Sequence, residues 1–222
     1  TTTTTRATPK SIVIIGGGIQ GTSIAYQLSQ KILKNASNQD TKTTIQILEA
    51  KAPASAASGK GGGFMARSWG DGGPTQGLHQ LSFDLYEGLA KELGCESYRK
   101  LPVISVAPGT KKASNAKESL GGIMPDWLDG NMGRIGLMGE GDDTAQVTPK
   151  EFVEKMIETG DIHVILGECI GVDVEDGGGG GGGDGKIVKG VKYIDRETKE
   201  ERVLEADVVV VSAGPWSCQA ED

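Results

Sequence analysis

Three glycines near the start of the chain have the spacing that accommodates the diphosphate of a dinucleotide. Gly16, Gly18 and Gly21 form a G-x-G-x-x-G pattern whose last two variable positions are Ile19 and Gln20. The first glycine permits a tight turn, the second leaves room for a pyrophosphate beside the backbone, and the third allows a helix to pack closely on a strand. Free N–H groups and the dipole at the start of that helix bind an anion without a basic side chain. The pattern therefore predicts a diphosphate site at this turn.

Glu49 has the chemistry and the position to bind the ribose of such a dinucleotide. It closes the second apolar strand, residues 43–48, and its carboxylate can accept hydrogen bonds from both ribose hydroxyls. It lies further from Gly21 than the usual ~20 residues, and the polar stretch 35–42 accounts for the difference. A strand before the glycines, a helix after them and this acid favour a dinucleotide site over the alternative, a glycine turn that binds no ligand.

A second glycine-rich segment, Ala56–Met65, follows the acidic strand directly. Such small residues allow the backbone to run along an extended cofactor, and Ser58 and Lys60 offer donors to phosphate oxygens. NAD-binding folds have no need of a second segment of this kind, so it favours FAD. The alternative is a surface loop, because glycine clusters usually punctuate loops.

The elements that must position these residues alternate between strands and helices. The β-branched run 11–15 predicts a strand buried on both faces, and the order of strand, glycine turn, helix and strand predicts the first βαβ unit of a doubly wound sheet. Two helices are expected from apolar stripes that face the core. These stripes are Ile24, Leu28 and Ile32 in the first helix and Leu78, Leu81, Leu85 and Leu89 in the second.

The second half of the chain predicts a helix, a β-meander and a last parallel strand. Thr148-Pro-Lys-Glu151 is a capping box that begins a helix, and the alternating apolar residues from 162 to 203 predict the meander. The tract Gly177–Gly183 is expected to be a flexible hairpin insertion. Strand 206–211 enters a turn with too little chain after it to pack back on the sheet, so the chain is expected to be truncated at its C-terminus.

We therefore predict an α/β fold in which a doubly wound, Rossmann-type FAD-binding domain carries a β-meander and is joined to a partial α+β substrate domain. The FAD-binding domain is discontinuous and comprises residues 9–93 and 148–222. Residues 94–147 form the partial substrate domain, and residues 1–8 form a flexible tail.

Composition narrows the class of protein. The 222 residues include 23 Lys+Arg and 30 Asp+Glu, a net charge of −7, which argues against nucleic acid or an anionic membrane as the main partner. No apolar stretch approaches the ~18 residues of a membrane span. Three distant cysteines and two histidines argue against a disulfide framework and a metal site. A cytoplasmic location is the default expectation, with an organelle as the alternative if an N-terminal segment is missing.

The chain resembles the FAD-dependent oxidoreductases of the D-amino acid oxidase type, which include glycine and sarcosine oxidases. Four segments match in order: Val13–Gly21 with Glu49, Ala56–Phe64, Ala145–Pro149 with its helix, and Ala206–Ser217. The run Ala57–Met65, continued through Trp69, Asp71–Pro74 and Leu81–Phe83, is most similar to a eukaryotic, poorly characterised oxidoreductase subgroup.

The resemblance implies a set of FAD contacts. Gly16, Gly18 and Gly21 would hold the pyrophosphate, and Glu49 the adenosine ribose. The other implied contacts are Ala50 and Lys51 near the adenine, Ser58, Gly59, Gly62 and Gly63 along the pyrophosphate and flavin, the backbone of Ile170–Val172 at the adenine, and Ala213 and Gly214 from the last strand. In such enzymes a hydride passes from the carbon beside a substrate amine to the flavin, and oxygen reoxidises the flavin.

Three functions remain open from the sequence. The first is an FAD-dependent oxidoreductase of a small amine or amino acid, and the others are an NAD-dependent dehydrogenase and a non-catalytic flavin-fold protein. In the family that it resembles, the residues that clamp the substrate carboxylate come from a C-terminal half that is absent here. No catalytic residue is therefore assigned, and this chain alone is expected to be inactive. Arg67 is expected to be an exposed or interdomain charge rather than a contact to the flavin or an anionic substrate.

Overall fold

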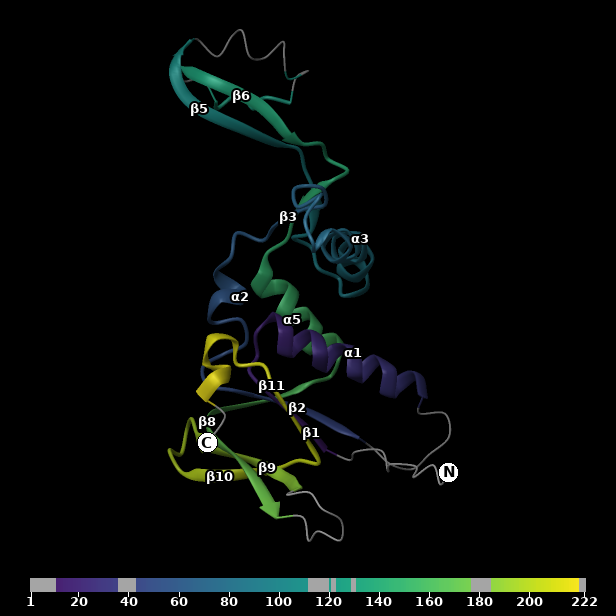
Figure 1. Cartoon of the computed structure of the whole chain (residues 1–222), viewed down its shortest axis with the longest axis vertical. Coiled ribbons are helices and arrows are strands. Elements are labelled where there is room, and N and C mark those ends of the chain that lie inside the picture. Colours follow the sequence, from purple (N-terminus) through teal and green to yellow (C-terminus); the bar gives the residue numbers. More distant parts are fainter. Residues whose placement is uncertain are drawn as a thin grey trace. The chain divides into compact units, whose positions relative to one another are not determined.

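A computed structural model of the chain (Figure 1) describes residues 11–35, 43–111, 120, 123–128, 131–176 and 185–219. These residues form two compact units. The first unit contains the described residues up to Gly61 and from Pro149 onward, and the second unit contains those of Gly62–Thr148. The predicted tail, the predicted hairpin at Gly177–Gly183 and most of the predicted loop 35–42 lie outside the described residues.

The first unit is built on a six-stranded sheet with the order β10-β9-β8-β2-β1-β11. Its strands are β1 (Ser11–Ile15), β2 (Thr44–Glu49), β8 (His163–Asp176), β9 (Lys186–Asp195), β10 (Glu201–Glu205) and β11 (Val208–Val211). The first part of β8 pairs with β2 in parallel, and the rest of β8 pairs with β9 antiparallel. The predicted α/β fold with a parallel sheet is confirmed, and β8, β9 and β10 form the predicted meander.

Both faces of the parallel strands are covered, as the continuous apolar sequence of β1 requires. On one face, Val13, Ile15 and Leu48 pack with Val191 and Tyr193 of the meander. The helices α1 (Ile19–Asn35) and α5 (Pro149–Thr159) contact each other and lie on the opposite side of the sheet (Figure 1). The first unit therefore has three layers, which are the helices, the parallel strands and the meander. The glycine turn lies where β1 passes into α1.

The face of α1 that packs on the sheet differs from the prediction. Ala25 and Tyr26 are fully buried, with Thr22 and Ser29 beside them, whereas Ile24 is 38% exposed and Leu28 and Ile32 are only half-buried. The first turn of α1 approaches β1 so closely that a Cβ on Gly21 would overlap the carbonyl oxygen of Gly16, and the side chains buried on this side of the helix are not the aliphatic ones at four-residue spacing. The apolar spacing of the larger residues therefore indicated the wrong side of this helix.

The described residues of the second unit form two small sheets and one long helix. The strands β3 (Phe64–Ala66), β7 (Thr144–Gln146) and β4 (Arg99–Lys100) form one sheet, and β5 (Val103–Lys111) pairs with β6 (Met132–Gly139) in the other. The helix is α3 (Gln76–Glu92). Because β3 pairs with β7, residues 62–93 belong to this unit, whereas the predicted boundary placed them with the FAD-binding domain.

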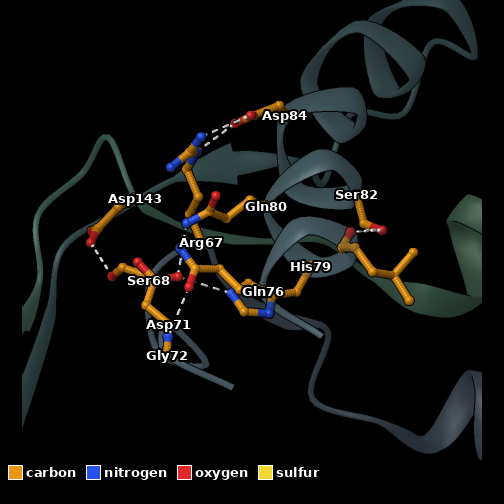
Figure 2. Close-up of polar contacts among 11 residues, drawn as sticks. Arg67, Ser68, Asp71, Gly72, Gln76, His79, Gln80, Ser82, Asp84 and Asp143 are labelled. Atoms are coloured by element: carbon orange, nitrogen blue, oxygen red, sulfur yellow. Dashed lines mark hydrogen bonds and ion pairs between the residues drawn. The ribbon is translucent and has the colours of Figure 1, made fainter. Parts of the chain in front are cut away.

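The leucine stripe of α3 is not a core face among the described residues. Leu78, Leu81 and Leu85 are 68%, 58% and 59% exposed, and the helix buries Phe83 and Ala90 instead. Polar contacts hold the helix in this orientation, as Figure 2 shows. Arg67 donates two hydrogen bonds to Asp84, and Asp71 accepts one from Gln80 and lies 3.1 Å from the ring of His79. These contacts tie α3 to the segment after β3, a constraint that helical periodicity does not report.

Substitutions on the buried and exposed sides of α3 are therefore expected to change the free energy of unfolding by different amounts. Phe83→Ala should lower the free energy of unfolding by about 3–5 kcal/mol, because it removes a buried ring. Leu81→Gln should change it by less than about 0.5 kcal/mol, because the side chain is already largely exposed. Urea titration of both variants measures the difference. A Leu81→Gln variant as unstable as Phe83→Ala would contradict this orientation of the helix.

No helix in the described part of the chain is both long enough and apolar enough to cross a membrane.

Candidate cofactor-binding site

The glycine turn lies at the carboxyl edge of the parallel strands, where β1, β2 and β11 end side by side. Ile15 is in register with Leu48 and with Val211, and Glu49 is in register with Leu166 of β8. In doubly wound sheets, ligands bind outside this edge of the sheet. The topology therefore brings the three glycines predicted for the diphosphate and Glu49, predicted for the ribose, to the edge of the sheet where a ligand is expected.

Two of the three motif glycines are required by packing. Gly16 has a φ of +107°, and a Cβ on it would overlap the carbonyl oxygen of Ser212 and lie 3.1 Å from Cα of Ala213. A Cβ on Gly21 would overlap the carbonyl oxygen of Gly16 and lie 3.2 Å from a methyl group of Ile14. Both positions exclude a side chain whether or not a ligand is bound.

Gly18 is different, because the space beside it is bounded by a single side chain. A Cβ there would lie 3.1 Å from Oγ of Ser58, and its next neighbour within 4 Å is Cβ of the same serine at 4.0 Å. The backbone at Gly18 is therefore open to close approach from outside. An approachable backbone at the second glycine is what a bound pyrophosphate needs, so this position fits the diphosphate of FAD.

Ser58 joins the second glycine-rich segment to the start of α1. It belongs to the short helix α2 (Ala57–Lys60), and its Oγ accepts a hydrogen bond of 3.0 Å from the N–H of Ile19, the first residue of α1. The first turn of α1 contains no acidic residue of its own, which leaves the start of the helix suited to an anion. The Ser58 hydroxyl proton remains available for a phosphate oxygen. The two glycine-rich segments predicted to share one ligand thus meet in the first unit.

The Glu49 carboxylate is held against the glycine turn by two backbone N–H groups. Oε2 accepts a hydrogen bond of 2.8 Å from Gly17, and Oε1 accepts one of 2.9 Å from Lys51. Each carboxylate oxygen has a second lone pair, so the group can still accept from ribose hydroxyls. The contact with Gly17 was not foreseen, because this glycine occupies a variable position of the motif.

Replacing Glu49 by alanine is expected to weaken FAD binding by roughly 1–3 kcal/mol, the cost of a lost charge-assisted hydrogen bond. Titration of the apoprotein with FAD, followed by flavin fluorescence, measures the change. Glu175→Ala is the matched control, because Glu175 is an exposed carboxylate on β8 that pairs with Lys189. Equal affinities for the Glu49→Ala and Glu175→Ala variants would contradict a ribose-binding role.

The remaining predicted residues of the second segment fall into two groups. Gly59 is required by packing, because a Cβ there would overlap the carbonyl oxygen of Ala54. Gly62 and Gly63 belong to the second unit. Gly62 has no neighbour within 4 Å of the position of a Cβ, and Gly63 has a φ of +67° and accepts a hydrogen bond from Val147. Their contact with the flavin stays a prediction.

Ile170 occupies a β-bulge in β8. Cys169 is opposite Tyr193 and Gly171 is opposite Lys192, so Ile170 is the extra residue between them. A bulge interrupts the ladder and leaves the extra residue without its usual pairing, and the Ile170 side chain is 45% exposed. A backbone group free of the ladder is suited to meet an adenine, and the contact of Ile170 with the adenine stays a prediction.

Ala213 and Gly214 follow β11 at the same edge of the sheet. The N–H of Ser212 donates a hydrogen bond of 2.8 Å to Ile15, which brings this segment alongside the end of β1. Gly214 has a φ of +60°, and a Cβ on it would have no neighbour within 4 Å. This glycine begins the 3₁₀ helix η2 (Gly214–Gln219). The approach of both residues to the cofactor remains a prediction.

Arg67 is engaged within the second unit. Its guanidinium donates two hydrogen bonds to Asp84, which raise the pKa of Arg67 and lower the pKa of Asp84. The side chain is 39% exposed, which agrees with an exposed charge rather than a free anion-binding group. In the described residues, no group of three or more His, Cys, Asp or Glu side chains could hold a metal ion.

Comparison with known proteins places this geometry in a family. The family model described as "DAO: FAD dependent oxidoreductase" matches residues 11–222. "Putative oxidoreductase C1F5.03c" of Schizosaccharomyces pombe is 28% identical over 221 residues, covering 95% of this chain and 56% of that protein. Fructosyl amine:oxygen oxidoreductase (Amadoriase I) from Aspergillus fumigatus has the same fold, with a TM-score of 0.63 and 16% identity over 98% of this chain and 51% of that one.

L-proline dehydrogenase from P. horikoshii is a further solved structure with this fold, with a TM-score of 0.61 and 16% identity over 95% of this chain and 54% of that one. The chain thus spans about half the length of the relatives that it matches. The family match covers nearly all of the chain and agrees with the glycine turn, the acid after β2 and the parallel sheet. The chain therefore belongs to the DAO family of FAD dependent oxidoreductases, whose cofactor is FAD.

Proposed function

We propose that this chain is the cofactor-binding part of an oxidoreductase that oxidises the C–N bond of an amine or an amino acid. The observation that carries the proposal is the convergence at one sheet edge of an approachable Gly18, the start of α1 and the Glu49 carboxylate. In the proposed complex Gly18 and the start of α1 hold the diphosphate, Glu49 binds the adenosine ribose, and Ser58 donates to a phosphate oxygen.

When bound, FAD would supply the redox chemistry, namely acceptance of a hydride from the carbon beside the substrate nitrogen and reoxidation by oxygen with release of hydrogen peroxide. The residues of this chain bind and orient the adenosine diphosphate end, so that the flavin is presented in one position. We propose that the second unit, residues 62–148, contributes to the substrate side.

The substrate class is supported by two proteins of the same fold. One is named for fructosyl amines and the other for L-proline, and both names are those of compounds that contain a carbon–nitrogen bond. The family match favours FAD over the NAD alternative. Because the chain spans about half of its relatives, we propose that this polypeptide alone binds FAD with little turnover.

Two experiments test the cofactor assignment and the substrate class separately. Purified chain should be yellow and should release FAD on denaturation, whereas colourless protein that binds NADH would overturn the cofactor assignment. The longest natural polypeptide containing this sequence should then lose its flavin colour anaerobically when an amine or amino acid is added. Bound flavin that is reduced by hydroxy acids but by no amine would refute the substrate class. Flavin that no compound reduces would favour the non-catalytic alternative.

A further inference from the structure

Arg196 connects three segments at the edge of the sheet where the cofactor is proposed to bind. It lies in the turn between β9 and β10. Its backbone N–H donates a hydrogen bond of 3.0 Å to the carbonyl of Leu166, which is in register with Glu49. Its guanidinium donates to the carbonyl oxygen of Lys51, 145 positions away in the sequence. All of these residues belong to the first unit.

The Lys51 residue is thereby held from both sides. Its carbonyl accepts from Arg196, and its N–H donates 2.9 Å to Oε1 of Glu49. The other oxygen of Glu49 accepts from Gly17 in the glycine turn. A continuous series of hydrogen bonds therefore runs from Arg196 through the segment after β2 to the carboxylate and on to the turn.

The turn that carries Arg196 is itself fixed. Oδ1 of Asp195 accepts hydrogen bonds from the N–H groups of Thr198 and Glu197, at 3.0 and 2.9 Å, and Oδ2 lies 3.4 Å from the guanidinium of Arg202. The bonds from the Thr198 and Glu197 N–H groups hold the pKa of Asp195 below its usual range. The carboxylate is therefore charged at neutral pH, and the position of Arg196 is set before any ligand binds.

We infer that Arg196 is a positioning residue for the adenosine end of the cofactor. It fixes the segment after β2 and, through the Lys51 N–H, aims the Glu49 carboxylate at the ribose. A carboxylate held in place before binding loses less conformational freedom when the ligand arrives. This inference rests on the proposed FAD site, and nothing in the sequence pattern of the turn indicates it.

The experiment measures dissociation constants of the purified chain for FAD, ADP and inorganic pyrophosphate. Arg196→Ala should raise the dissociation constants for FAD and ADP by about tenfold. The dissociation constant for pyrophosphate should not change, because pyrophosphate has no ribose. Arg196→Lys should restore part of the affinity, since its ammonium can still donate to the Lys51 carbonyl. Lys189→Ala is the control, because it removes one charge from an exposed pair with Glu175 on the same sheet. It should change none of the three dissociation constants.

A double-mutant cycle tests whether Arg196 acts through Glu49. In a Glu49→Gln background, Arg196→Ala should have little further effect on ADP affinity, because interacting residues are not additive. Additive effects, or an equal loss of pyrophosphate affinity, would overturn the positioning role. An Arg196→Ala variant that binds ADP as tightly as the wild type would also overturn the positioning role, but it would not contradict the proposed FAD site. Wild-type protein that binds neither FAD nor ADP would overturn both.

Discussion

Gly18→Ala is expected to abolish retention of FAD while leaving the fold intact. The new methyl group would lie 3.1 Å from Oγ of Ser58 and meets no other residue within 4 Å, so the free chain tolerates it. It would fill the space through which a diphosphate approaches the backbone, and it crowds the hydroxyl that accepts from Ile19. We expect the affinity for FAD to fall at least about 100-fold, or about 2.8 kcal/mol.

Flavin content after gel filtration and the far-UV circular dichroism spectrum together measure this result. Gly88→Ala in α3 is the matched control, since a Cβ there has no neighbour within 4 Å, and it should keep the flavin of the wild type. A Gly18→Ala protein with full flavin content would show that the diphosphate binds elsewhere. A Gly18→Ala protein with an unfolded spectrum would show that the methyl group is not tolerated by the free chain.

Local patterns predicted the elements that carry the site. The strands at residues 11–15 and 44–49 are short β-branched runs bounded by turn residues, and the helix between them begins at Ile19, inside the motif. The predicted helix at Pro149 likewise begins at that proline and buries Phe152, Val153 and Met156. These features depend on neighbours in the sequence, so the sequence could specify them.

The buried face of a helix depends on tertiary contacts between residues that are far apart in the sequence. In α1 the buried face is chosen by the close approach of Gly21 to β1, which favours Ala25 over Ile24. In α3 it is chosen by polar contacts from Arg67 and Asp71 to the helix. In both cases hydrophobic periodicity identified a helix but assigned the wrong side to the core, because tertiary contacts override an amphipathic preference.

In the candidate site, too, some features could be predicted from local sequence and others depend on tertiary contacts. The motif glycines and Glu49 could be named from their spacing, because the βαβ connection fixes where they meet. The contact between Ser58 and Ile19 spans 39 positions, and that between Arg196 and Lys51 spans 145. The first contact follows from the pairing of β2 with β1, and the second from the pairing of β8 with β2, which no local pattern encodes.

Gly21→Ala is expected to destabilise the first unit severely, in contrast to the same substitution three positions earlier. Its methyl group would overlap the carbonyl oxygen of Gly16 and press on Ile14, which is fully buried. Neither neighbour is the end of a flexible side chain, so α1 must move away from β1. Overpacking of a core costs about 1–3 kcal/mol, and we expect the upper end of that range or more, because a backbone atom is displaced.

Urea unfolding of the Gly21→Ala and Gly18→Ala chains, both without FAD, separates the two roles within one motif. Gly21→Ala should shift the midpoint to clearly lower urea, whereas Gly18→Ala should unfold close to the wild type. The slope of the transition should stay the same in both, since the surface exposed on unfolding does not change. A Gly21→Ala chain with a wild-type midpoint would mean that α1 has room to move, and that the third glycine, like the second, is required by the ligand rather than by the fold.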